Sequence, residues 1–149
     1  MKSIKYAIAT AFIALTACGG GGGGGGTDSD KSFFGTWKGD LFLVNRTDNC
    51  QLNTPDPISR TIIVEEPRQG DKGVVVSILG EEVDGRGDIK GGTLTTSFSN
   101  SIPSLRRRII VTDLTPLGDG TADFDYTVTL EPLTSRRCTF KYRGQLTRG

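Results

Sequence analysis

The chain has 149 residues, with 18 basic and 17 acidic side chains, so its formal net charge is close to zero. A near-neutral chain does not favour wholesale binding of nucleic acid, which needs a basic face. The chain contains no histidine, and this removes the usual general base and the Ser-His and Cys-His nucleophile pairs of enzymes. Residues 33–149 have the usual size of a single domain.

Residues 1–17 have the order of a secretion signal. Lys2 and Lys5 precede an apolar run at 6–15 and then small residues. The run is shorter than the about 20 residues that a membrane span needs. The tetrapeptide Leu15-Thr16-Ala17-Cys18 resembles the bacterial lipobox, which implies cleavage before Cys18 and acyl chains on that residue. Two or more acyl chains anchor a protein stably. The alternative is a simple signal peptide whose cysteine lies there by chance.

Residues 18–32 are expected to form the lipidated cysteine and its tether. Eight glycines at 19–26 precede a short polar stretch, and neither segment can bury apolar surface to offset ordering entropy. Such a coil has a reach of about 20 Å. Gly19 is not the aspartate that in enterobacterial lipoproteins resembles an inner-membrane retention signal, so the resemblance implies the outer membrane, on either its periplasmic or its surface face.

From residue 33 onward apolar and polar residues alternate with the period of strands that bury one face. Turn signals at 69–73, 84–87, 91–92 and 117–120 separate the runs. The pattern predicts an all-β domain at 33–149, an antiparallel up-and-down barrel of seven or eight strands, with a β-sandwich as the alternative. The runs lie at 37–44, 58–65, 74–79, 94–98, 108–114, 122–131 and 138–147, with a poorer one at 83–89.

Two further cysteines, Cys50 and Cys138, follow the first predicted strand and begin the last. Beyond the inner membrane the compartment is oxidising, so a disulfide is the simplest expectation. First and last strands are neighbours in a closed barrel, and the 88-residue separation would stabilise the fold by about 4 to 5 kcal/mol in the chain-entropy model. A metal site on these thiols lacks a histidine to complete it; we expect no metal and no cofactor.

The segment Gly35-Thr36-Trp37 resembles the Gly-x-Trp opening of lipocalin and avidin-like (calycin) barrels. The resemblance implies that Trp37 closes one barrel end and that a cation from the last strand covers its ring. Strand parity from Cys138 leads to Arg148, and such a contact contributes about 0.5 to 2 kcal/mol. A similar opening, with a nearby cysteine, occurs in small barrel inhibitors of secreted metalloproteases and their lipoprotein relatives. The alternative is that Trp37 is an ordinary core aromatic.

The remaining charged motifs are interpreted as surface. The basic run 106–108 could bind an anionic group. We expect instead that these residues are exposed to solvent at the start of a strand, where their charges discourage pairing of a sheet edge with another chain. Arg86-Gly87-Asp88 spells the integrin-binding tripeptide, which arises easily by chance in a Gly-rich turn. The acidic clusters match no calcium loop and show no pair converging in a cleft, so solvated carboxylates are expected. These clusters are Glu65-Glu66, Glu81-Glu82-Asp84 and Asp119, Asp123 and Asp125, with Asp84 and Asp88 as a further calcium candidate.

We therefore expect a protein anchored to the outer membrane that is not an enzyme. The first hypothesis is a binding or inhibitory module that presents a face or the barrel mouth to a protein or a small ligand. The second is a structural envelope lipoprotein that contacts cell wall or other membrane components. An interior filled by aromatic side chains favours surface binding over enclosure of a ligand. These side chains are Trp37, Phe124, Tyr126, Phe140 and Tyr142.

Overall fold

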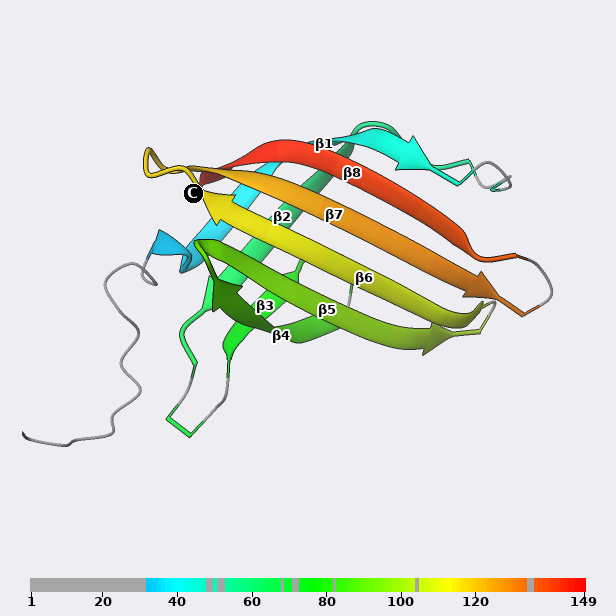
Figure 1. The fold of residues 1–149 in the computed structure, drawn as a ribbon, viewed down its shortest axis with the longest axis horizontal. Helices are drawn as coiled ribbons and strands as arrows, with labels where there is room; N and C mark the ends of the chain where they lie inside the picture. The colour runs from blue at the N-terminus through cyan, green and yellow to red at the C-terminus, as the bar shows by residue number, and fades with distance from the viewer. Residues whose placement is uncertain are drawn as a thin grey trace, which may run out of the picture.

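The structure is a computed structural model that describes residues 32–47, 50, 53–67, 69–70, 73–81, 83–103, 105–133 and 136–149. Within these residues the chain forms eight strands, each antiparallel to the next, and the last pairs with the first to close a barrel (Figure 1). The predicted up-and-down barrel is confirmed and the β-sandwich alternative is wrong. The strands are β1 Gly35–Arg46, β2 Ile58–Glu65, β3 Val74–Ile78, β4 Val83–Lys90, β5 Thr93–Ile102, β6 Leu105–Pro116, β7 Thr121–Pro132 and β8 Cys138–Arg148.

The barrel interior is filled by the alternating apolar residues of the strands. On β7, Ala122, Phe124 and Tyr126 are buried, whereas Asp123 between them is exposed. The five aromatic residues expected inside are all buried. One-face burial of this kind fixes the pairing register, because a slip of one residue would turn the apolar face outward.

Strand β4 confirms the poorer predicted run at 83–89 and corrects the turn expected at 84–87, because these residues lie within the strand. A Cβ atom at Gly85 would lie 2.4 Å from the Phe98 ring, and one at Gly87 would lie 2.5 Å from Thr96 Oγ1. These glycines therefore make room for side chains of β5 inside the barrel. The tripeptide that begins at Arg86 runs along a strand and not around a tight loop, which removes the basis of the integrin interpretation.

The barrel wall is uneven in height. Strands β1, β6 and β7 have 12 residues each, whereas β2 and β4 have 8 and β3 has 5. The β3–β4 turn, residues 79–81, is held against β2 by a hydrogen bond from the Leu79 amide to the Thr61 carbonyl, 3.0 Å long. A turn on this short side can place a side chain inside the barrel, and Glu81 does so.

Antiparallel connectivity places alternate connections at opposite ends of the barrel. The start of β1, the β6–β7 turn and the C-terminus lie at one end (Figure 1). We call this the Trp37 end. The β1–β2, β3–β4, β5–β6 and β7–β8 connections lie at the other end, which we call the mouth. The two ends differ in how they are filled.

Candidate binding site at the barrel mouth

The Trp37 end is sealed by a set of contacts between the first and last strands. Trp37 is 1% exposed, and its indole Nε1 donates a hydrogen bond of 2.8 Å to the Phe33 carbonyl. The guanidinium of Arg148 lies over the indole, 4.7 Å from the ring centre, and donates a hydrogen bond to the Ser32 carbonyl. Arg148 is the residue to which the parity of the last strand led. The chain therefore enters the barrel at its sealed end.

The mouth contains a hollow of about 270 Å³. This volume is close to the lower limit of small-molecule sites, roughly 300 Å³, and corresponds to about nine water molecules at roughly 30 Å³ each. Several apolar residues around it remain only partly buried. The lining residues are Thr54, Pro55, Ile58, Arg60, Glu81, Ile102, Leu105, Arg108, Tyr126, Val128, Leu130, Phe140 and Tyr142.

The polar part of the hollow converges on the Glu81 carboxylate. Its Oε1 accepts hydrogen bonds of 2.9 Å from Arg60 Nη2 and from the Tyr126 hydroxyl. Its Oε2 accepts one of 2.7 Å from Arg108 Nη1, and Arg108 Nη2 also donates to the Glu81 carbonyl. Arg108 is further held by Asn100, whose Oδ1 accepts from Nε at 3.1 Å. Two cations and one phenol thus bind one carboxylate.

Arg60 also packs on the aromatic ring of this group. Its guanidinium carbon lies 5.1 Å from the centre of the Tyr126 ring, within the range of a cation–π contact. Burial, and next the negative charge of Glu81, raise the pKa of the Tyr126 hydroxyl far above its usual value, so the phenol remains a hydrogen-bond donor. The Nε–H of Arg60 is buried and meets no acceptor in the described part of the chain.

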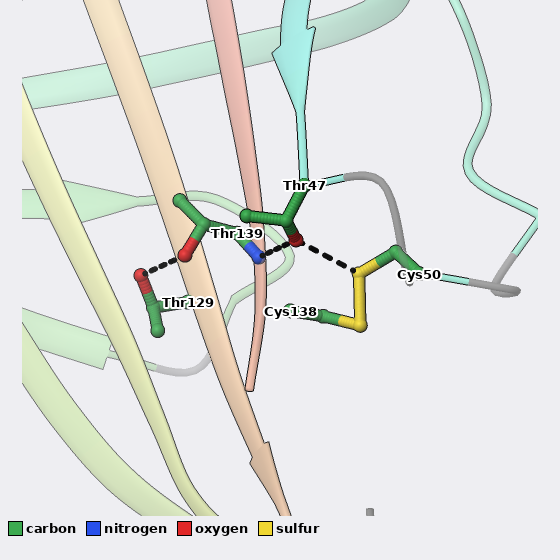
Figure 2. Close-up of a disulfide and its surroundings, with 5 residues drawn as sticks. All are labelled: Thr47, Cys50, Thr129, Cys138 and Thr139. Atoms are coloured by element: carbon green, nitrogen blue, oxygen red, sulfur yellow. Dashed lines mark hydrogen bonds between the residues drawn. A yellow bond between two sulfur atoms is a disulfide. The ribbon is translucent and has the colours of Figure 1, made fainter. Parts of the chain in front are cut away.

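A disulfide fixes one side of the mouth. Cys50 and Cys138 are bonded, with their Cα atoms 5.4 Å apart, as the sequence predicted. Figure 2 shows Thr47, just past the end of β1, beside Thr139 of β8: its hydroxyl accepts a hydrogen bond from the Thr139 amide and donates one to Cys50 Sγ. The bridge joins the β1–β2 connection to β8, and this connection supplies Thr54 and Pro55 to the hollow.

Several predicted surface carboxylates do lie on the surface. Glu65, Glu66 and Asp84 are exposed. Asp119 accepts hydrogen bonds from the Thr121 amide and hydroxyl in the β6–β7 turn, and these bonds lower its pKa. Asp125 pairs with Arg143 on the outer face. Among the described residues no three His, Cys, Asp or Glu side chains gather as a metal site.

Two surface interpretations are wrong. The Glu81 side chain is only 12% exposed and that of Arg108 only 19%, because both turn into the barrel. The sequence does contain a signal for the inward arginines: Arg60 lies two residues from the inward Ile58 and Ile62, and Arg108 lies two residues before the inward Ile110. No periodicity marks Glu81, since it lies in a turn.

Cys18 and the signal lie outside the described residues. Comparison of the chain with protein-family models, curated proteins and solved structures finds no match. None of the helical segments in the described ranges has the length and apolar character needed to cross a bilayer. The barrel and its mouth are therefore the basis for a functional argument.

Proposed function

We propose that the protein is a lipoprotein anchored to the outer membrane whose barrel acts as a non-enzymatic binding module, with the mouth as the binding site. The observation that carries this proposal is the hollow of about 270 Å³ at the mouth, with apolar walls around a polar base. Concave sites that combine apolar walls with a few convergent polar groups are the usual places for ligands.

The position of the chain entry supports this role for the mouth. The expected tether ends at Ser32, whose carbonyl accepts a hydrogen bond from Arg148 at the Trp37 end. A lipid on Cys18 would therefore connect the membrane to the sealed end through a segment with a reach of about 20 Å. The mouth lies at the opposite end, where a partner or ligand in the adjacent compartment can reach it.

The proposal gives the barrel no catalytic role. The chain has no histidine, and the Glu81 carboxylate at the mouth is held by two arginines and a phenol. A carboxylate that is engaged in this way is a poor general base, because its lone pairs already accept hydrogen bonds from cations. The contact between Trp37 and Arg148 supports the resemblance to lipocalin-like barrels as part of this proposal.

Site-specific photo-crosslinking in intact cells tests the proposal. Leu133, beside the mouth, is 59% exposed, and Leu117, in the β6–β7 turn of the Trp37 end, is 48% exposed. A photoreactive residue at Leu133 is expected to form an adduct with a partner or ligand, and the same residue at Leu117 is not. Equal adducts at both positions would favour a structural envelope role through the whole outer surface, and no adduct at Leu133 would count against the mouth as a binding site.

A further inference from the structure

We propose that the base of the mouth is a carboxylate-binding site, occupied in this structure by the chain's own Glu81, and that it takes a monocarboxylate with a short aliphatic tail. This inference rests on the proposed role of the mouth as the binding site and names the chemistry of the ligand. It is based on a difference in location: the groups that donate hydrogen bonds lie on strands, and the group that accepts them lies in a turn.

The donors belong to the barrel wall and the acceptor does not. Arg60, Arg108 and Tyr126 lie on β2, β6 and β7, and each is paired in register with at least one neighbouring strand. Glu81 lies in the β3–β4 turn, next to the shortest strand of the barrel. Turns and loop tips open locally at a lower free energy than paired strands. The donor set can therefore stay in place while the Glu81 side chain leaves.

The charge of the site favours an anion. Among the described residues that line the hollow, Arg60 and Arg108 are cationic and Glu81 is anionic, so the hollow keeps a net positive charge with Glu81 in place. If Glu81 moves out, two partly buried guanidinium groups remain without a counter-charge, which is costly. A carboxylate from a ligand removes that cost, and it does so better than any neutral group.

The geometry of Arg60 leaves room for a better acceptor than Glu81. The Nε and Nη2 edge of a guanidinium can hold both oxygens of one carboxylate. Glu81 uses only Nη2, at 2.9 Å, and the buried Nε–H has no acceptor among the described residues. A free carboxylate, which is not tied to a turn, can align with both N–H groups.

The walls above these donors fit an aliphatic tail. Ile102, Leu105, Val128 and Leu130 line the hollow and are only partly buried, so a tail between them would remove apolar surface from water, which favours binding. The volume of about 270 Å³ admits a chain of about eight carbons, taking a carbon group as about the size of a water molecule. Octanoate is therefore the appropriate probe, and octanamide is its neutral counterpart with the same shape.

The test uses the mature chain with Cys18→Ser, which retains every described residue. In the Glu81→Ala variant, calorimetry is expected to show octanoate binding about tenfold or more tightly than octanamide, and octanoate should raise the unfolding temperature of this variant more than that of the parent. Adding Arg108→Met should abolish the preference for octanoate. Arg106→Met, on the same strand but exposed, should leave it unchanged.

Equal affinity of Glu81→Ala for octanoate and octanamide would overturn the carboxylate site while leaving the mouth as a binding place. Binding of neither probe would overturn it as well. If Glu81→Ala does not fold, the test is made on the parent protein. Octanoate, and not octanamide, is then expected to shift the Arg60 Nε–H resonance in nuclear magnetic resonance spectra. An unchanged Arg60 resonance at saturating octanoate would reject the inference.

Discussion

The guanidinium of Arg148, at the end of β8, lies 4.7 Å from the centre of the Trp37 ring near the start of β1. The backbones of these two residues are also paired across the β1–β8 seam that closes the barrel. The contact between these two side chains therefore depends on two features: the closure of the Trp37 end and the pairing of β8 with β1. It also links the two ends of the described chain, since Arg148 donates to the Ser32 carbonyl.

Replacing Arg148 by alanine should lower the free energy of unfolding by about 0.5 to 2 kcal/mol, because the cation–π contact is lost. The emission of Trp37, the only tryptophan in the chain, should change at the same time, as its ring loses a cover. Urea unfolding followed by tryptophan fluorescence measures both quantities. Arg106→Ala, at an exposed position of β6, is the control and should change neither; an Arg148→Ala protein with unaltered emission and stability would contradict the assignment.

Reduction of the bridge from Cys50 to Cys138 should destabilise the barrel by about 4 to 5 kcal/mol in the chain-entropy model, because the bridge closes a separation of 88 residues. The double variant Cys50→Ser, Cys138→Ser should behave like the reduced protein, and reducing agent should not change it further. Thermal unfolding with and without reductant measures the effect. Two titratable thiols in protein purified from the envelope without reductant would contradict the bridge.

The sequence predicted strands best where apolar and polar residues alternate, and its signals conflict at β4, where a poorer strand run and a turn signal overlap. The period of two along 122–131 and 138–147 reflects one buried face, and β7 and β8 follow it. Gly85 and Gly87 were interpreted as turn residues, because glycine is frequent in turns; their true role, space for Phe98 and Thr96, depends on a neighbouring strand.

The polar base of the mouth escaped prediction for a related reason. An arginine at an inward position contradicts the usual burial of apolar residues, so Arg60 and Arg108 were not placed inside. Their partner Glu81 comes from a different hairpin, 21 and 27 residues away in the chain. The burial of the two arginines and their pairing with Glu81 could not be deduced without knowing how short β3 is. The length of that strand is set by its pairing with neighbouring strands and not by the local residue pattern.

Gly144→Ala should destabilise the protein by about 1 to 3 kcal/mol, the usual cost of overpacking. A Cβ atom there would lie 2.3 Å from the Asp40 carbonyl oxygen, and a backbone atom of the paired strand β1 cannot move aside without disturbing the seam. Chemical denaturation measures the change. Gly149→Ala is the matched control, since its nearest neighbour would be 3.8 Å away. Equal stability of the two variants would show that the seam tolerates a side chain at Gly144.

Metabolic labelling with a palmitate analogue should tag the wild-type chain and not the Cys18→Ser variant. The reason is the lipobox-like Leu15-Thr16-Ala17-Cys18, in which the thiol of the cysteine is the acceptor of the lipid. Fractionation should recover the labelled protein with outer membranes. Cys50→Ser, which affects only the bridge, should label as the wild type does. Equal labelling of wild type and Cys18→Ser would remove the lipid anchor from the proposal.

Asp125 should make part of the barrel's stability dependent on pH in the acid range. Its carboxylate accepts hydrogen bonds of 2.7 and 3.2 Å from Arg143, and Lys141 Nζ lies 3.6 Å away. The hydrogen bonds from Arg143 lower the pKa of Asp125 most, against the opposing effect of burial, and Lys141 lowers it further. In the unfolded chain the pKa returns to about 3.9.

A carboxyl whose pKa is lower in the folded state stabilises that state when it is ionised. The contribution of Asp125 is therefore complete above its unfolded pKa of about 3.9 and is lost as the pH falls through the lower folded pKa. Because Arg143 is well exposed, at 61%, we expect only about 0.2 to 1 kcal/mol at pH 7. Asp125→Asn should be less stable than wild type by this amount at neutral pH, and the difference should shrink toward zero below about pH 4. Denaturation curves measured across this range, with Asp88→Asn on the exposed face of β4 as control, test the sign; a difference that grows as the pH falls would contradict it.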